Sequence, residues 1–201
     1  MISTVAFDFG GVLAEDGFLD GLNKLATQWN CNTDWLKKIA VETIYNCGYV
    51  NGHCDENRFW KLLAQNSGIR FEASTAREII VDGFTLRPGV IQYMQKIRQA
   101  GYHLVLLSDH TNWLDELDQR KPFFHLFHRV YNSYHVHKNK RDGTIFPYVL
   151  ADLGVKSQKV VLIDDNPEYI DLAKKMGLIG VLFTEIESVK NSLGSILSQL
   201  S

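Results

Sequence analysis

Five short apolar segments, separated by stretches long enough to form helices, constrain the fold of this chain most strongly. Each segment is rich in Val, Ile, Leu or Phe, which is typical of parallel strands buried on both faces. Strands that alternate with helices of this length predict an α/β fold with a doubly wound, mostly parallel, Rossmann-like sheet. The predicted strands are Ser3–Phe9, His103–Leu107, Arg129–Ser133, Lys159–Ile163 and Ile179–Phe183.

Proline and glycine mark the ends of two helices between these strands. Pro88 begins a helical pattern that stops at Gly101, and Pro167 begins another that stops at Gly177. Proline suits the first turn of a helix because an N–H there would have no partner, and glycine readily adopts the backbone conformation that ends a helix. A last amphipathic helix is predicted from the apolar residues Ile186, Val189, Leu193, Ile196, Leu197 and Leu200.

Residues 16–83 break the alternation, because they contain helical patterns and no clear strand. We expect this segment to form a helical cap domain inserted after the first strand, with residues 1–15 and 84–201 forming the α/β core domain. Such a cap would cover the carboxyl edge of the sheet, where open α/β sheets bind their ligands. We expect one or two of its aromatic residues to line the pocket, from among Trp29, Trp35, Tyr45, Tyr49 and Trp60.

Charge and hydropathy argue against two classes of partner. The 201 residues include 21 Lys and Arg against 23 Asp and Glu, a net charge of −2, whereas a nucleic-acid-binding domain would show a basic excess. No apolar run approaches the roughly 20 residues that a membrane-spanning helix needs. Asp8 interrupts the apolar start of the chain, which therefore does not look like a secretory signal. We expect a cytoplasmic protein with no nucleic-acid and no membrane partner.

Four histidines lie close together in the sequence and could in principle bind a transition metal: His125, His128, His135 and His137. No paired Cys or Glu completes a helical ligand set around them. We therefore favour the interpretation that they form a polar, partly exposed edge of the molecule.

Polar residues follow four of the predicted strands at their carboxyl ends. They are Asp8, Gly10 and Gly11 after the first strand, Ser108, Asp109 and His110 after the second, Lys140 after the third, and Asp164 and Asp165 after the fourth. Three carboxylates with no Cys or His among them favour an oxygen-binding cation such as Mg²⁺. Ser108 and Lys140 could then hold the oxygens of an anion, which leaves Asp8 as a nucleophile.

Each of these residues alone also has an ordinary structural interpretation. An Asp before Gly is often a turn residue, and a Ser after a strand is often a cap. Asp164 and Asp165 could simply cap a helix and interact with its dipole. Four such strand ends in this order, however, are not expected by chance.

These motifs resemble those of the haloacid dehalogenase-like hydrolase superfamily, and the resemblance covers nearly the whole chain. Phe7-Asp8-Phe9-Gly10-Gly11-Val12-Leu13 resembles its first motif and Leu106-Leu107-Ser108 its second. Lys140-Arg141-Asp142-Gly143-Thr144-Ile145-Phe146 is similar to the third, and Ile163-Asp164-Asp165-Asn166-Pro167-Glu168 to the fourth. Within the superfamily, the sequence is most similar to the capped branch that holds sugar-phosphate phosphatases and the phosphatase domain of soluble epoxide hydrolase.

The resemblance implies a role for each matching residue. Asp8 would be the nucleophile that becomes an aspartyl-phosphate, and the carbonyl of Gly10 would ligate Mg²⁺ together with Asp8 and Asp164 or Asp165. Ser108 and Lys140 would bind the transferring phosphoryl group, and Gly10 and Gly11 would allow the backbone to approach the small phosphorylated substrate. The cap would select that substrate and exclude water.

One position departs from the pattern of most phosphatases in the superfamily. They carry a second Asp two residues after the nucleophile, which protonates the leaving group and later activates water, whereas this chain has Gly10. Asp109 or His110, directly after Ser108, could take its place.

Three functions remain compatible with this departure. The first is a phosphatase whose acid comes from elsewhere. The second is hydrolysis of the 2-haloacid dehalogenase type, in which the departing halide needs no proton. The third is a protein that binds a phosphorylated ligand or a partner with little or no catalysis.

Overall fold

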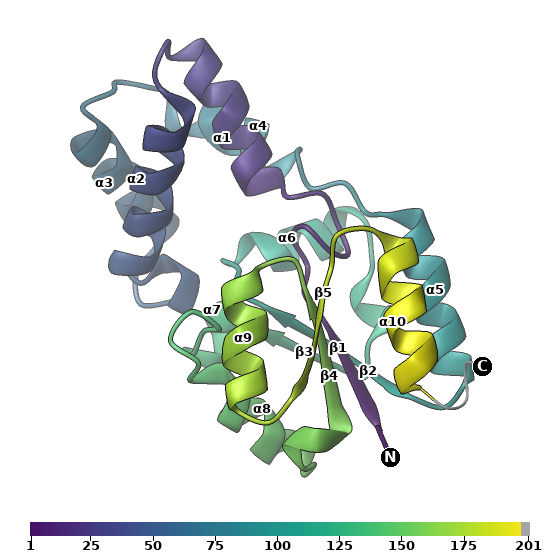
Figure 1. Cartoon of the computed structure of the whole chain (residues 1–201). Coiled ribbons are helices and arrows are strands. Elements are labelled where there is room, and N and C mark those ends of the chain that lie inside the picture. The colour runs from purple at the N-terminus through teal and green to yellow at the C-terminus, as the bar shows by residue number, and fades with distance from the viewer. Residues whose placement is uncertain (198–201) are drawn as a thin grey trace.

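The computed structural model describes residues 1–197 and confirms the α/β fold (Figure 1). Within these residues a parallel sheet of five strands has the order β3-β2-β1-β4-β5. Each strand overlaps its predicted segment to within two residues at either end. The strands are β1 Thr4–Phe7, β2 His103–Ser108, β3 Arg129–Asn132, β4 Val160–Asp164 and β5 Ile179–Leu182.

Successive residues of β1 face two separate apolar layers, which makes the sheet doubly wound. Val5 and Phe7 pack with α5 (Pro88–Gln99) and α10 (Ile186–Ile196), whereas Ala6 packs with α8 (Ile145–Leu153) and α9 (Pro167–Lys175). Figure 1 shows these two pairs of helices on opposite faces of the sheet. Side chains alternate between the faces of a strand, so a strand buried on both sides reads as continuously apolar.

Pro88 and Pro167 begin helices as expected, and the residues Gly101 and Gly177 follow those helices with positive φ angles of 89° and 85°. The last helix also forms as predicted. Leu200, which we expected on its apolar face, lies outside the described residues.

The segment between β1 and α5 contains the helices α1 to α4 and no strand of the sheet. Their bounds are α1 Gly17–Gln28, α2 Thr33–Asn46, α3 Glu56–Ser67 and α4 Ala73–Val81, with a short 3₁₀ turn, η1, at Tyr49–Asn51. Asp16, Asn32 and Asp55 cap the first three by accepting backbone N–H groups. Figure 1 shows α1 to α4 as a group beyond the carboxyl ends of the strands. The helices lie within the predicted insertion, and its separation into a domain remains a prediction.

Helices α1 and α4 cross closely because Gly21 carries no side chain. A Cβ atom at this position would lie only 2.6 Å from Cγ1 of Ile80 in α4. Helix α1 therefore presents a smooth surface to α4, and the two helices pack as a pair.

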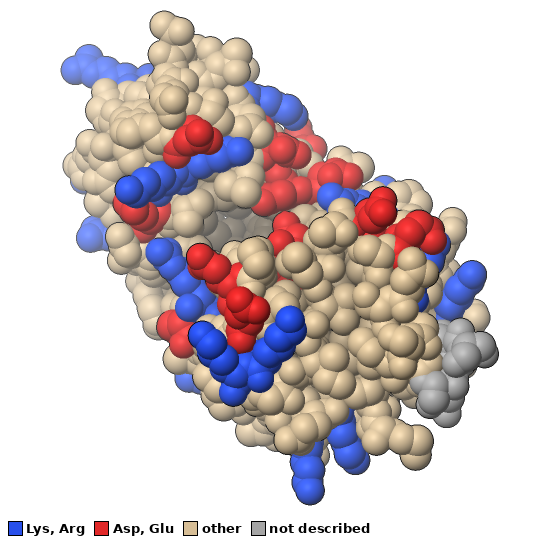
Figure 2. All heavy atoms as spheres, viewed as in Figure 1, with Lys and Arg blue, Asp and Glu red and all other residues tan. Residues whose placement is uncertain are grey.

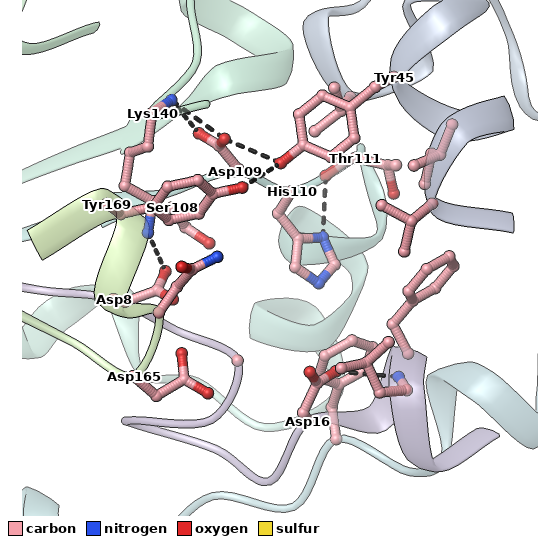
Figure 3. A pocket seen from close by; sticks show the side chains of 18 of the residues that line it. Asp8, Asp16, Tyr45, Ser108, Asp109, His110, Thr111, Lys140, Asp165 and Tyr169 are labelled. Atoms are coloured by element: carbon pink, nitrogen blue, oxygen red, sulfur yellow. Dashed lines mark hydrogen bonds and ion pairs between the residues drawn. The ribbon is translucent and has the colours of Figure 1, made fainter. Parts of the chain in front are cut away.

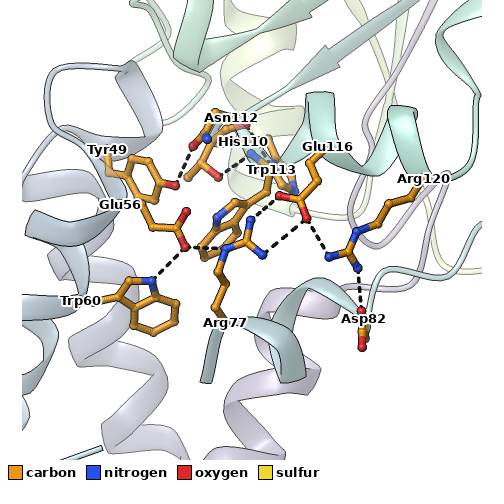
Figure 4. A network of polar contacts seen from close by, with 11 residues as sticks. Tyr49, Glu56, Trp60, Arg77, Asp82, His110, Asn112, Trp113, Glu116 and Arg120 are labelled. Atoms are coloured by element: carbon orange, nitrogen blue, oxygen red, sulfur yellow. Dashed lines mark hydrogen bonds and ion pairs between the residues drawn. The ribbon is translucent and has the colours of Figure 1, made fainter. Parts of the chain in front are cut away.

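A network of ion pairs ties these helices to α6 (Trp113–Arg120), which follows β2 (Figure 4). Arg77 of α4 pairs with Glu56 of α3 at 2.8 Å and also with Glu116 of α6. Arg120 continues the network, with Glu116 and Asp82 each at 2.7 Å. Because Arg77 and Glu116 are only about a quarter exposed, at 24% and 29%, solvent screens their pairing incompletely.

An aromatic cluster lies beside this network. Trp113, only 1% exposed, stacks on Trp60 with ring centroids 6.0 Å apart and meets the rings of Tyr49 and Phe59 edge-on. The hydroxyl of Tyr49 donates to Oδ1 of Asn112 at 2.6 Å. Helices α1 to α4 therefore contact the rest of the molecule through both apolar packing and polar bonds.

None of the helices within residues 1–197 has the length and apolar composition to cross a membrane. The cytoplasmic location expected from the sequence remains a prediction.

Replacement of Arg77 by Met keeps most of the aliphatic stem and removes the guanidinium. We expect the free energy of unfolding to fall by about 1–2 kcal/mol, because Arg77 joins two carboxylates in a partly buried setting. Urea denaturation measures this change, and the difference from the wild type should shrink at high salt. Arg70→Met, at an exposed position near the start of α4, is the control. An equal loss in both variants would contradict the assignment.

Candidate active site

A pocket of about 550 Å³ lies where α1, α2 and η1 face the carboxyl ends of β1, β2 and β4. Figure 2 shows the corresponding hollow between the two parts of the molecule, with acidic side chains along its rim. Its charged and polar residues come mainly from the strand ends, and its apolar residues mainly from α1 and α2. It is lined by Asp8, Gly10, Asp16, Phe18, Leu19, Val41, Ile44, Tyr45, Val50, Phe84, Ser108, Asp109, His110, Thr111, Trp113, Lys140, Asp165, Asn166, Pro167, Glu168 and Tyr169.

Three carboxylates converge at the sheet end of this pocket. Asp8, Asp164 and Asp165 each offer an oxygen, and these atoms all lie within 4.8 Å of one another. Among residues 1–197 this is the one group of three or more His, Cys, Asp or Glu side chains arranged closely enough to hold a metal ion. Burial raises the pKa of Asp8 well above its usual value despite Lys140, and burial with Asp164 and Asp16 nearby raises the pKa of Asp165 to about 6.

Lys140 joins two of these carboxylates. Its Nζ lies 2.8 Å from Oδ1 of Asp8 and 2.5 Å from Oδ2 of Asp164, and the side chain is 1% exposed. Burial alone would lower the pKa of Lys140, but Asp164, Asp8 and Asp109 raise it above its usual range. The ammonium group is therefore a fixed positive charge beside the tip of β1.

Asp109 is held by bonds from both parts of the molecule (Figure 3). Its carboxylate accepts the backbone N–H of Lys140 at 2.8 and 3.0 Å, and Oδ2 also accepts the hydroxyl of Tyr45 from α2 at 3.0 Å. The hydroxyl of Tyr45 lies 2.9 Å from that of Tyr169 in α9. Burial raises the pKa of Asp109, while the charge of Lys140 opposes that rise. Asp109 thus fixes the backbone at Lys140 and anchors α2.

His110 has one ring nitrogen that contacts the protein and one that does not. Its Nδ1 lies 3.3 Å from the carbonyl of Thr111, to which it can donate only as N–H. Burial lowers the pKa of His110 to about 4, so the ring is neutral and Nε2 carries a lone pair. Nε2 is buried with no hydrogen-bond partner within the described residues, and in Figure 3 it lies on the side of the ring that faces Asp16.

The two glycines after β1 differ in what they permit. A Cβ at Gly10 would meet only Cε1 of Phe84, at 3.7 Å, so this position can accept a side chain. Gly11 has φ +79°, and a Cβ there would lie 2.0 Å from Oδ2 of Asp165. Glycine is therefore required at position 11 for Asp165 to approach the loop. Arg87 holds the same loop by donating from Nη1 to the carbonyl of Gly11 at 2.7 Å.

The residues predicted to form the site lie together. Gly10, Asp8, Ser108, Asp109, His110, Lys140 and Asp165 all line the pocket. Gly11 and Asp164 do not line it. Gly11 lies beside the carboxylate of Asp165, and the fully buried Asp164 pairs with Lys140, which does line the pocket. Ser108 ends β2 and is 1% exposed.

Of the aromatic residues of the insertion considered in the sequence, Tyr45 lines the pocket, whereas Trp29, Trp35, Tyr49 and Trp60 do not. Sequence reasoning missed Phe84, Trp113 and Tyr169. Nothing in their local sequence marks them, since each reaches the pocket only through the packing of its element.

The clustered histidines make other contacts. His135 pairs with Asp115 at 2.7 Å, Nδ1 of His137 lies 2.7 Å from the carbonyl of Asn51, and the ring of His128 stacks on His103. These contacts agree with the interpretation of a polar edge.

The donor set at the tip of β1 fits a divalent, oxygen-binding cation. Three carboxylates held this closely repel one another, and this repulsion adds to burial, the larger cause, in raising the pKa values of Asp8 and Asp165. Lys140 compensates only part of this negative charge. Oxygen ligands alone favour Mg²⁺ over softer metals.

The chain is similar to several known proteins. A family model described as "Hydrolase: haloacid dehalogenase-like hydrolase" matches residues 2–177. The chain is 35% identical over 71 residues, 35% of its length, to drimenol cyclase drtB from Aspergillus calidoustus, covering 13% of that protein. It is 20% identical over 137 residues, 67% of its length, to flavin mononucleotide hydrolase 1 from Arabidopsis thaliana, covering 56% of that protein. It therefore spans about half or less of these curated relatives.

Solved structures show the same fold. An enzyme of this family from Bacteroides thetaiotaomicron, in complex with magnesium and inorganic phosphate, has a TM-score of 0.71 at 18% identity over 90% of this chain and 94% of that one. An L-2-haloacid dehalogenase from Xanthobacter autotrophicus has a TM-score of 0.68 at 16% identity, over 97% and 83%. A phosphatase from Thermococcus onnurineus has a TM-score of 0.62 at 19% identity, over 92% and 87%.

Replacement of Lys140 by Met leaves Asp8 and Asp164 buried without their cation. In metal-free buffer at pH 7.5, we expect the free energy of unfolding to fall by about 3 kcal/mol, because an unpaired buried charge is costly. The folded-state pKa of Asp8 is already raised and rises further without Lys140. The folded state therefore binds more protons than the unfolded state, and its stability falls as the pH rises.

The loss should consequently be smaller at pH 5, where Asp8 can protonate. Urea denaturation at both pH values measures it, with the exposed Lys175→Met in α9 as the control. A loss that is equal at both pH values would contradict the proposed pairing.

Proposed function

The chain belongs to the haloacid dehalogenase-like hydrolase family, and from this premise we propose that it is a Mg²⁺-dependent phosphatase acting on a small phosphorylated metabolite. The observation that carries the proposal is the position of Lys140, whose ammonium group lies between Asp8 and Asp164 beside the carboxylate cluster. A fixed cation and a divalent metal site at one strand end are suited to binding a phosphoryl group.

Asp8 is the proposed nucleophile. One of its oxygens attacks phosphorus, the bond from phosphorus to the leaving oxygen breaks, and an aspartyl-phosphate forms while the leaving oxygen takes a proton from solvent. Water then attacks that phosphorus and gives up a proton to a base, the bond from phosphorus to Asp8 breaks, and inorganic phosphate and Asp8 are released. Bound Mg²⁺, held by Asp8, Asp165, the carbonyl of Gly10 and Asp164, would reduce the repulsion between Asp8 and the incoming phosphate. Lys140, in the loop before α8, and Ser108, the last residue of β2, would bind the phosphoryl oxygens.

We assign the proton-transfer role to His110 rather than to Asp109. The oxygens of Asp109 already accept bonds from Lys140 and Tyr45, whereas Nε2 of His110, a residue of the pocket lining, has no partner within the described residues. The ring of His110 also packs against Phe84, the side chain that a Cβ at Gly10 would touch, with centroids 5.0 Å apart. His110 therefore lies near the place that an acid at position 10 would occupy. As a neutral imidazole, it is suited to accept a proton from the attacking water.

Dehalogenation is the second candidate, and it is favoured by the absence of a carboxyl group at position 10 and by the fold shared with a haloacid dehalogenase. Hydrolysis of a carbon–halogen bond does not call for a cation site, so the carboxylate cluster favours the phosphatase. A protein that only binds its phosphorylated ligand is the third candidate.

We expect the purified protein to release p-nitrophenol from p-nitrophenyl phosphate only when Mg²⁺ is present. Asp8→Asn keeps the size of the side chain and removes its nucleophilic charge, so the rate should fall by about 10³-fold or more. The absorbance of p-nitrophenolate measures the rate, and the exposed Asp20→Asn in α1 is the matched control.

Other outcomes would select the alternatives. Chloride release from 2-chloropropionate without Mg²⁺ would assign the site to dehalogenation. Tight binding of Mg²⁺ by calorimetry, with no turnover of p-nitrophenyl phosphate or of the smaller acetyl phosphate, would favour the binding protein.

His110→Gln should lower kcat for p-nitrophenyl phosphate by about 10²-fold, because general-base help is typically worth 10²–10⁴. The double variant His110→Gln, Gly10→Asp should recover a large part of that loss, because position 10 has room for a carboxyl group that lines the same pocket. His110→Gln, Gly10→Asn is the matched control, since an amide of equal size cannot accept the proton. An unchanged kcat in His110→Gln, together with inactivity of Asp109→Asn, would assign the role to Asp109.

A further inference from the structure

The pocket has a charged floor and an apolar roof. The roof comprises Phe18 and Leu19 of α1, Val41 and Ile44 of α2, and Val50 of η1, all of which line the pocket. These side chains lie opposite Asp8, which follows β1, and Lys140, which lies in the loop between α7 (Ser133–Val136) and α8. Since a pocket of about 550 Å³ is larger than a phosphoryl group needs, the leaving group must lie against this roof.

The polar groups of α2 and η1 near the roof are already bonded within the protein. The hydroxyl of Tyr45 donates to Asp109, that of Tyr49 donates to Asn112, and the carbonyl of Val50 accepts the hydroxyl of Ser133 at 2.6 Å. Within residues 1–197, the buried Nε1 of Trp113 is an indole donor without a partner beside this roof. The roof therefore offers one free donor to the several hydroxyl groups of a sugar, and the other polar side chains of the lining that could bond them, such as Asp16, Thr111 and Glu168, lie outside the roof.

The charges of the lining also disfavour a second anionic group on the substrate. Lys140 is the one Lys or Arg among the lining residues, and it already pairs with Asp8 and Asp164. The other charged residues of the lining are carboxylates, namely Asp8, Asp16, Asp109, Asp165 and Glu168. Arg141 lies near the pocket with its guanidinium 4.7 Å from the centre of the Tyr45 ring, but it does not line it.

The roof is fixed relative to the floor. Tyr45 joins α2 to Asp109, and Ser133 joins η1 to the end of β3. The apolar surface of the roof therefore faces Asp8 before any ligand binds. Binding of a matching ligand then costs no conformational entropy for ordering the roof.

We propose that the substrate is the phosphate monoester of an apolar, uncharged alcohol, such as an aryl or medium-chain alkyl alcohol. This inference rests on the proposed phosphatase function and narrows it. Apolar carbon gains free energy by leaving water for the roof, whereas sugar hydroxyls would lose their bonds to water without replacement. Selection thus comes from α1, α2 and η1, while the strand ends supply the chemistry.

A series of primary alkyl phosphates tests the roof. We expect kcat/KM to rise by about two- to four-fold for each methylene added from methyl to hexyl phosphate. Hexyl phosphate should exceed glucose 6-phosphate by roughly 10-fold or more, although both release a primary alcohol. Calorimetry with methyl- to hexylphosphonate, which cannot be hydrolysed, should show the same rise in affinity when Mg²⁺ is present.

Val41→Asp places a charge on the roof and should lower the hexyl-to-methyl ratio of kcat/KM by about five-fold or more. Val41→Thr, in which the side chain stays nearly the same size, should also lower that ratio. It serves as the test if the Asp variant does not fold. Glu42→Ala, at the exposed next position of α2, is the control and should keep the wild-type ratio.

The outcomes separate this inference from the proposed function. Phosphonate affinity that does not depend on chain length, or a preference for glucose 6-phosphate, would overturn the apolar roof as the selecting surface. Chain-length-dependent phosphonate binding, without turnover of any phosphate ester or of the anhydride acetyl phosphate, would retain the roof and overturn the phosphatase.

Discussion

The ammonium group of Lys140, held between Asp8 and Asp164, is the interaction on which the rest of the site depends. Parallel strands bring the ends of β1 and β4 side by side, and the tips of both carry carboxylates. Such a pair is unfavourable in a buried setting unless a cation compensates it. The backbone N–H of Lys140 in turn fixes Asp109 at the end of β2. One residue thus connects three strand ends and makes the negative cluster compatible with folding.

Asp109 extends this arrangement to the helices above the sheet, because it also accepts the hydroxyl of Tyr45. On another side, the pairing of Arg77 with Glu116 and the packing of Trp113 on Trp60 hold α4 and α3 to α6, and these two helices pack against α1 and α2. The roof of the pocket is therefore attached on two sides. The charged floor and the apolar roof belong to different parts of the chain, which allows the reaction and the choice of substrate to depend on separate residues.

The absence of a carboxyl group at position 10 could be read directly from the sequence, but its replacement could not. Asp109 and His110 are neighbours along the chain and looked equivalent as substitutes. Folding distinguishes them, since Asp109 accepts hydrogen bonds from Lys140 and Tyr45 while His110 turns into the space beside Phe84 with Nε2 free. The surroundings of the two side chains come from segments far away in the sequence, so local patterns carried no signal for them.

The α/β fold, the strands and the convergence of their polar ends could be predicted from the sequence, because short apolar runs and the Pro and Gly helix ends are local properties. The sequence also identified Asp8, Ser108, Lys140 and Asp165 as neighbours, since parallel strands place their carboxyl ends at one edge. The pairing of Asp164 with Lys140, the anchoring of α2 by Tyr45 and the position of Phe18 and Val41 over the pocket became visible only in the folded molecule. The physical reason is that these relations depend on how helices distant in sequence pack against the sheet, and the pattern of apolar residues along a helix does not specify its partner.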